Sequence, residues 1–152
     1  MSENLIEILL VEDNPNDVEL TLRAFKQHKL TNPVRVARDG AEALAFLFGE
    51  GPEAQAGIGH PPKVILLDLK LPKIDGLEVL RRIKSDPRTR AIPVVVLTSS
   101  REEQDIVKSY AFGVNSYIVK PVDFEQFTEA ARILGLYWTL LNEPPAPTAA
   151  AA

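Results

Sequence analysis

The sequence alternates five times between a short apolar run and a segment with helical spacing. Most of the apolar runs are β-branched and lack polar alternation, which is typical of strands covered on both faces of a parallel sheet. We expect strands at Leu5–Val11, Val34–Ala37, Val64–Leu67, Val94–Leu97 and Ser116–Val119. Strands and helices in regular alternation predict an α/β fold.

Each predicted strand is followed by a segment whose apolar residues recur with the period of an α-helix. We expect helices at Pro15–Gln27, Gly40–Phe48, Gly76–Ser85, Glu102–Phe112 and Asp123–Leu141. The Asn14-Pro15 pair suits a helix start, Asp75 and Asp123 are candidate N-caps, and Gly113 suits the end of the fourth helix. These signals support the phasing of strands and helices.

Length and composition fit one globular domain that folds alone. The chain has 152 residues, of which 45% are hydrophobic and 25% charged. This length lies within the roughly 100–200 residues that are usual for one domain. We expect the domain to span residues 5–141 and the Pro/Ala-rich residues 142–152 to form a disordered tail. Residues 49–62, rich in Gly and Pro, predict a long connection at the sheet edge away from the strand carboxyl ends.

Charge and the missing cysteines exclude several kinds of function. Seventeen basic against twenty-one acidic residues give a net charge of −4, which offers no attraction to nucleic acid or anionic lipid. Without cysteine there is no disulfide or thiolate site, and two isolated histidines, His28 and His60, cannot form a zinc cluster. With no basic leader and no run near about 18 apolar residues, we expect a cytoplasmic protein that binds neither nucleic acid nor membrane.

Polar side chains follow four of the five predicted strands: Glu12 and Asp13, Asp68, Thr98, and Lys120. In an open parallel sheet, ligands bind outside the carboxyl ends of the strands, so these groups should converge. Clustered carboxylates repel one another unless a cation neutralises them, and oxygen ligands of this charge suit Mg²⁺. Each residue alone has a simpler explanation as a turn, helix-start or solvated side chain. Turn chemistry does not readily explain all four strand ends together.

Four segments, LLVEDN, ILLDLKLPKIDG, VVVLTSS and YIVKP, occur in this order within residues 5–141. In combination they resemble the receiver domain of two-component response regulators. The resemblance implies a doubly wound, flavodoxin-like fold in which five parallel strands, in the order 2-1-3-4-5, are flanked by five helices. The stretch DLKLPKIDGLEVLRRIKSDPRTRAIPVVVLTSS and the ending LYWTLLNEPP are similar to the single-domain regulators that partner bacterial phytochrome kinases.

The resemblance implies that Asp68 accepts a phosphoryl group from the phosphohistidine of a sensor histidine kinase. Mg²⁺ would be bound directly by Asp13 and Asp68, through water by Glu12, and by the backbone carbonyl of Lys70. The cation would hold the phosphoryl oxygens during an in-line attack by the carboxylate. Such a receiver catalyses its own phosphorylation and dephosphorylation and turns over no separate substrate, so we expect no enzyme in the ordinary sense.

The resemblance also assigns roles to residues on the last two strands. Lys120 would supply a second cation, and a cis peptide between Lys120 and Pro121 would turn it toward the acceptor. Thr98 would hydrogen-bond the phosphoryl group after transfer and move inward. Tyr117 stands where the family has an aromatic ring that fills the vacated space, so phosphorylation would switch the face formed by the fourth helix, fifth strand and fifth helix.

The last predicted helix is apolar on more than the one stripe needed to cover the sheet. We therefore predict a homodimer through the fourth helix, fifth strand and fifth helix, burying roughly 1,200–2,000 Å². The candidate dimer residues are Ile106, Tyr110, Ile133, Leu136, Tyr137 and Leu140. The alternative is that the extra apolar residues only cover the base of the sheet and the tail.

Three other interpretations share this architecture. A flavodoxin-like cofactor binder needs a phosphate loop rich in Ser, Thr and Gly after the first strand, but residues 12–17 are Glu-Asp-Asn-Pro-Asn-Asp. An aspartyl-phosphate phosphatase typically has a second acid two residues after its nucleophile, where this chain has Lys70. A degenerate receiver would act only as a binding module, and the intact Asp68, Thr98 and Lys120 argue against it.

Overall fold

The structure, a computed structural model, describes residues 7–49, 61–100, 102, 114 and 116–133. Five parallel strands form one sheet: β1 (Ile8–Val11), β2 (Val34–Ala37), β3 (Val64–Asp68), β4 (Val94–Thr98) and β5 (Ser116–Val119). Their order is β2-β1-β3-β4-β5, which confirms the predicted doubly wound sheet. Strands β3 and β4 extend one residue beyond their predicted ends, so Asp68 and Thr98 are the last residues of their strands.

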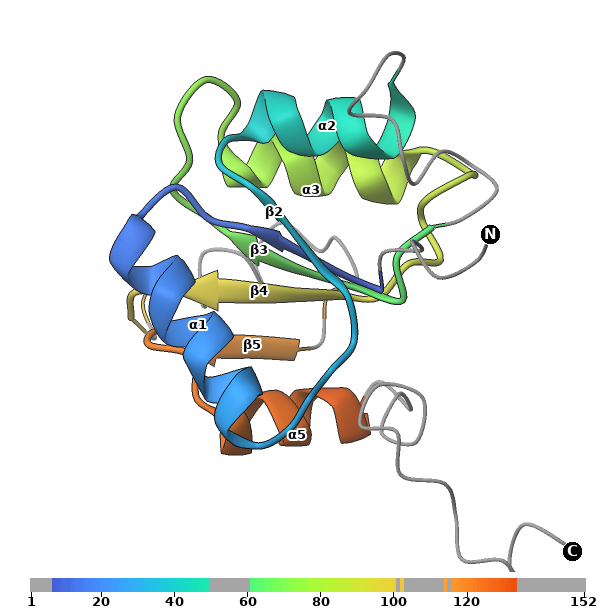
Figure 1. The fold of residues 1–152 in the computed structure, drawn as a ribbon. Coiled ribbons are helices and arrows are strands. Elements are labelled where there is room, and N and C mark those ends of the chain that lie inside the picture. Colours follow the sequence, from blue (N-terminus) through green and yellow to red (C-terminus); the bar gives the residue numbers. More distant parts are fainter. Residues whose placement is uncertain (1–6, 50–60, 101, 103–113, 115, 134–152) are drawn as a thin grey trace, which may run out of the picture.

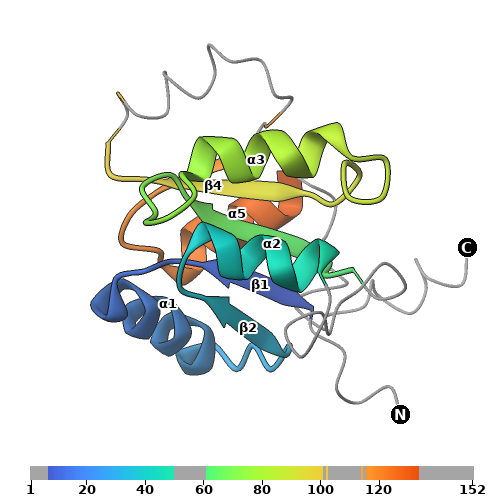
Figure 2. The ribbon, with the colours of Figure 1, turned by 90° about the horizontal axis from the view of Figure 1, so that it is seen from above.

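Four helices lie in the described part of the chain: α1 (Pro15–Gln27), α2 (Gly40–Phe48), α3 (Gly76–Ser85) and α5 (Phe124–Ile133). Helices α2 and α3 cover one face of the sheet, and α1 and α5 cover the other (Figures 1 and 2). The first three have their predicted bounds; the predicted helix at 102–112 and the last predicted helix beyond Ile133 fall outside the described elements. None of the described helices is long and apolar enough to span a lipid bilayer.

The start of α1 is fixed by side-chain capping. Asn14 Oδ1 accepts hydrogen bonds from the backbone amides of Asn16, at 2.8 Å, and Asp17, at 3.2 Å. Pro15 is the first helical residue, where its missing N–H costs no hydrogen bond. This cap fixes the first turn of α1, in which Asp17 lies.

The other helix starts are fixed in different ways. Asp39, which the sequence analysis did not single out, caps α2 by accepting from the amide of Glu42 at 2.7 Å. Asp123 accepts from the amide of Gln126 at 2.8 Å at the start of α5, as predicted. Asp75 precedes α3 as predicted, but its side chain makes no capping hydrogen bond.

Close backbone packing fixes the start of α3 instead. A Cβ atom on Gly76 would lie 2.3 Å from the carbonyl oxygen of Asp68 and 2.5 Å from that of Leu69. The Gly76 amide donates to the Leu69 carbonyl at 3.0 Å. Only a residue without a side chain allows this approach. The helix start is therefore pressed against the end of the strand that carries Asp68.

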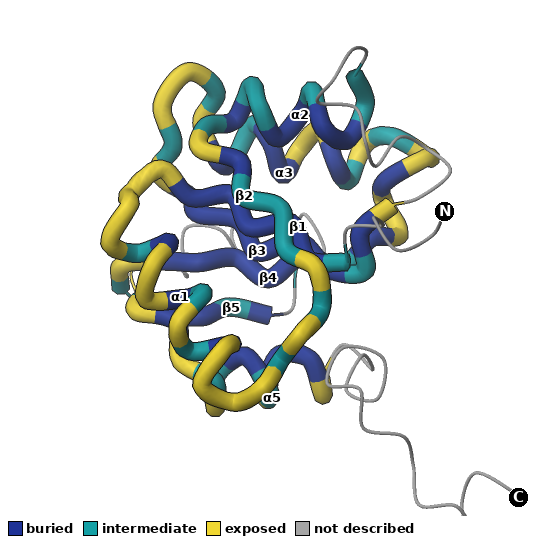
Figure 3. The backbone as a smooth tube through the Cα atoms, viewed as in Figure 1, coloured by how far each residue is buried: buried dark blue, intermediate teal, exposed yellow. Residues whose placement is uncertain are grey.

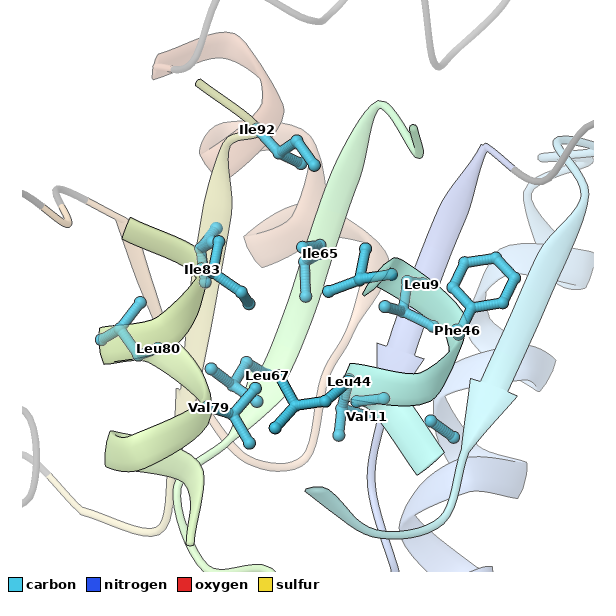
Figure 4. Packing of buried hydrophobic residues seen from close by; sticks show 14 of the residues in the cluster. Leu9, Val11, Leu44, Phe46, Ile65, Leu67, Val79, Leu80, Ile83 and Ile92 are labelled. Carbon is cyan, nitrogen blue, oxygen red and sulfur yellow. The ribbon is translucent and has the colours of Figure 1, made fainter. Parts of the chain in front are cut away.

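The core has two apolar layers, one on each face of the sheet. The layer under α2 and α3, shown in Figure 4, includes Leu9, Val11, Ile65, Leu67, Phe46, Val79, Leu80 and Ile83. The layer under α1 and α5 contains Phe25 and Phe127, whose ring centroids are 4.7 Å apart. Figure 3 shows that the central strands are buried, whereas parts of the helices are exposed. Burying each such side chain stabilises the fold by about 1.5–3 kcal/mol.

Candidate functional site

The carboxyl ends of β1, β3, β4 and β5 meet along one edge of the sheet (Figure 1). Register brings them side by side: Asp68 pairs with Leu97 on β4, and the Lys120 amide donates to the Thr98 carbonyl at 2.8 Å. The polar residues that the sequence predicts at these strand ends are therefore neighbours in space.

The Lys120 ammonium is the centre of this group. Its Nζ lies 3.2 Å from Asp68 Oδ2, 3.3 Å from Glu12 Oε1 and 3.1 Å from Asp17 Oδ2. An ammonium has three N–H donors, so each acceptor can take one of them. The contact between Lys120 and Asp68 joins residues far apart in the chain, and the role that the family resemblance implies for Lys120 stays a prediction.

Three carboxylates, Glu12, Asp13 and Asp68, form what we call the acidic triad. Each offers an oxygen within 4.8 Å of the others. Glu12 and Asp68 are buried, whereas Asp13 is exposed. Buried carboxylates this close repel unless protonated or neutralised by a cation. The triad therefore opens toward solvent through Asp13.

Burial and charge perturb the ionisation of this group. The pKa of the Glu12 carboxyl is raised to about 7, first by burial and then by its hydrogen bond to Asp68 and the Asp68 charge. The amide of Asn14, which donates to Glu12 Oε2 at 3.2 Å, and the charge of Lys120 act in the opposite direction. Burial acts to lower the pKa of Lys120, but the Asp17 hydrogen bond and the charges of Asp68 and Glu12 outweigh it and raise the pKa.

The two oxygens of Asp68 have different partners. Oδ2 accepts from Lys120, and Oδ1 lies 3.3 Å from the backbone amide of Lys70, which donates to it. The Asp68 side chain is only 4% exposed. Its carboxylate is thus held in one orientation at the end of β3.

Thr98 is buried at the end of β4, and its Oγ1 has no hydrogen-bond partner in the part of the chain that the structure describes. A buried hydroxyl without a partner costs about 1–3 kcal/mol. Such a group is available to an acceptor that arrives at the strand ends.

The loop after β5 contains the predicted cis peptide between Lys120 and Pro121. The Gln126 side-chain amide donates to the Pro121 carbonyl at 3.1 Å, which ties this loop to α5. This hydrogen bond links the segment that carries Lys120 to α5.

Asp17 is the residue of this site that the sequence analysis missed. It lies in the first turn of α1, outside the strand ends that formed the candidate set. The sequence indicates only that Asp17 is an acidic residue in the first turn of a predicted helix. Such a residue ordinarily interacts favourably with the helix dipole. The structure instead directs its carboxylate to Lys120.

Tyr117 is half-buried on β5, and its hydroxyl donates to the Val114 carbonyl at 3.0 Å. Burial raises the pKa of this phenol. Of the candidate dimer residues, Ile133 is 52% exposed. The remaining five, at positions 106, 110, 136, 137 and 140, lie outside the described residues.

The acidic triad has the chemistry of a hard-cation site. All its donors are oxygens, which Mg²⁺ and Mn²⁺ prefer, and one exposed carboxylate leaves room for water ligands. The Lys120 ammonium already neutralises part of the charge from one side. The residues present therefore fit a divalent cation.

Comparisons with known proteins give relatives over most of the chain. Residues 8–132 match the family model of the response regulator receiver domain. The chain is 43% identical over 147 residues to the probable methanogenesis regulatory protein FilR2 of Methanothrix harundinacea, covering 96% of this chain and 92% of that protein. It is 39% identical over 131 residues to the response regulator Rcp1 of Synechocystis, covering 86% and 87%.

Solved structures agree with these matches. The bacteriophytochrome response regulator AtBRR is 57% identical, with a TM-score of 0.81 over 92% of this chain and 99% of that one. The bacteriophytochrome response regulator RtBRR is 56% identical, with a TM-score of 0.82 over 97% of this chain and 88% of that one. The Mn²⁺-bound form of Rcp1 is 36% identical, with a TM-score of 0.63 over 93% of this chain and 99% of that one. Because the family model matches residues 8–132 and the sheet order and the strand-end site agree with it, this chain belongs to the response regulator receiver domain family.

Proposed function

We propose that the chain accepts a phosphoryl group on Asp68 from a sensor histidine kinase. The observation that carries the proposal is the position of Asp68, which belongs to the acidic triad and also contacts the Lys120 ammonium at 3.2 Å. In the transfer, an Asp68 oxygen forms the new P–O bond as the P–N bond of the donor histidine breaks. The donor imidazole leaves with the electron pair.

The acceptor needs positive charge on both sides of the incoming phosphoryl group. We propose that Mg²⁺ is held by Asp13 and Asp68, by Glu12 through water, and by the Lys70 carbonyl. The oxygen donors of the acidic triad and the Mn²⁺-bound form of the relative Rcp1 support this assignment. When bound, the cation stabilises charge on the phosphoryl oxygens. Lys120 neutralises the same group from the other side.

Thr98 and Tyr117 are the proposed switch. The Thr98 hydroxyl lacks a partner in the described part of the chain, so a phosphoryl oxygen would satisfy it after transfer. Its inward movement would free space for the ring of Tyr117, which is half-buried on the neighbouring strand. Phosphorylation at Asp68 would in this way alter the outer surface of β5 and α5.

Two partners are proposed, a histidine kinase and a second copy of the chain. The likeness to two bacteriophytochrome response regulators supports a phytochrome-type histidine kinase as the phosphodonor. We also propose a homodimer that uses the surface of α5. Ile133 is an exposed apolar residue on this helix, and further apolar residues follow it in the sequence.

Incubation with a small acyl phosphate and Mg²⁺, followed by intact-mass measurement, tests the acceptor. We expect one added phosphoryl group, lost when Mg²⁺ is chelated and in Asp68→Asn. Glu19→Gln, an exposed acid on α1, is the charge-matched control and should label like the parent protein. Equal labelling of Asp68→Asn and the parent would disprove Asp68 as the acceptor.

A further inference from the structure

Asp17 differs from the other two partners of Lys120 because it is not part of the acidic triad. Its Oδ2 makes the shortest of the three contacts with Lys120 Nζ, at 3.1 Å. Glu12 and Asp68 contact the same ammonium but also contribute oxygens to the triad. A divalent cation at the triad and Lys120 would therefore compete for Glu12 and Asp68, but not for Asp17.

The backbone of Asp17 is held firmly in place. Its amide donates to the cap residue Asn14, and its carbonyl accepts from the Thr21 hydroxyl at 2.9 Å. The Asp17 side chain is 26% exposed, against 16% for Lys120. The Asp17 carboxylate, carried on this fixed backbone at the rim of the site, thus contacts a mostly buried ammonium.

Phosphoryl transfer changes what Lys120 must neutralise. Before transfer its three donors face three carboxylates. During transfer, one or two of these donors must turn to phosphoryl oxygens while the ammonium stays beside Asp68. An ammonium on a flexible four-carbon stem needs an anchor to stay there, because its side chain carries about 2 kcal/mol of rotamer entropy.

We propose that Asp17 is a positioning residue for phosphoryl transfer, which anchors the Lys120 ammonium beside Asp68 from outside the acidic triad. The inference rests on the proposed function of Asp68. It assigns Asp17 no contact with the phosphoryl group or the cation. The ordinary alternative is that Asp17 only stabilises the first turn of α1 through the helix dipole.

The test compares Asp17→Asn, which keeps the shape but removes the charge, with the parent protein. The rate of labelling by a small acyl phosphate is measured over a range of donor concentrations at saturating Mg²⁺, and Mg²⁺ affinity is measured separately by calorimetry. We expect the maximal rate to fall about tenfold, while the half-saturating donor concentration and the Mg²⁺ dissociation constant stay within about twofold. Asp17→Glu should recover part of the rate, and Glu19→Gln should change nothing.

A double-mutant cycle with Lys120→Ala separates positioning from a merely structural effect. If Asp17 acts through Lys120, Asp17→Asn has no further effect on the rate in the Lys120→Ala background. A parental rate in Asp17→Asn, or an equal loss with and without Lys120, overturns the inference. Failure of the parent to label, or labelling of Asp68→Asn, would instead overturn the proposed function.

Discussion

Glu12 shows how the site changes the chemistry of a single residue. Its side chain is 1% exposed, and its pKa is raised from 4.5 to about 7 by burial and by Asp68. Between these pH values the folded protein holds a proton that the unfolded chain has lost. The stability from this group is therefore fully present below pH 4.5 and is lost as pH rises through about 7.

This linkage predicts a pH dependence of stability in metal-free protein. The free energy of unfolding is measured with urea, in the presence of a chelator, at pH 5 and at pH 8. Between these pH values the parent should lose on the order of 2 kcal/mol more stability than Glu12→Gln. Glu19 is exposed, so the free energy of unfolding of Glu19→Gln should change between the two pH values as that of the parent does. Parallel pH curves for the parent and Glu12→Gln would contradict the raised pKa.

Helices α1, α2 and α3 match their predicted bounds, and two of their ends are marked by residues in the sequence. Pro15 and the cap Asn14 begin α1, and Gly49 follows the last residue of α2. The convergence of strand ends was equally predictable, because parallel strands of known order share one edge. The contact of Asp17 with Lys120 was not, because it depends on the angle at which α1 packs on the face of the sheet. No local pattern encodes that angle.

The junction of β3 and α3 leaves no room for a side chain at Gly76. Gly76→Ala would ordinarily stabilise a helix, yet its Cβ would overlap the carbonyl oxygens of Asp68 and Leu69. We expect a loss of about 2–3 kcal/mol in the free energy of unfolding, together with slower labelling of Asp68. Ser85→Ala, exposed at the end of the same helix, should change stability little. Thermal and urea unfolding measure both; an unchanged or raised stability of Gly76→Ala would refute the close approach.

If the protein forms the proposed dimer, light scattering at tens of micromolar should give a mass near twice 16.8 kDa. Ile133→Glu should shift the protein toward the monomer, because a buried unpaired charge is costly at an interface. Leu20→Glu is the control, since Leu20 is also an exposed apolar residue but lies on α1. A monomeric parent, free and phosphorylated, would rule the dimer out.

The residues of the site are divided between the two halves of the chain. Glu12, Asp13 and Asp17 all precede β2, whereas Asp68, Thr98 and Lys120 all follow α2. A cut between α2 and β3 would divide the chain into one fragment with most of the carboxylates and another with Asp68, the proposed acceptor, and the Lys120 ammonium. Neither fragment could assemble the chemistry alone. Phosphoryl acceptance would then report the reassociation of the two halves, as in a split reporter.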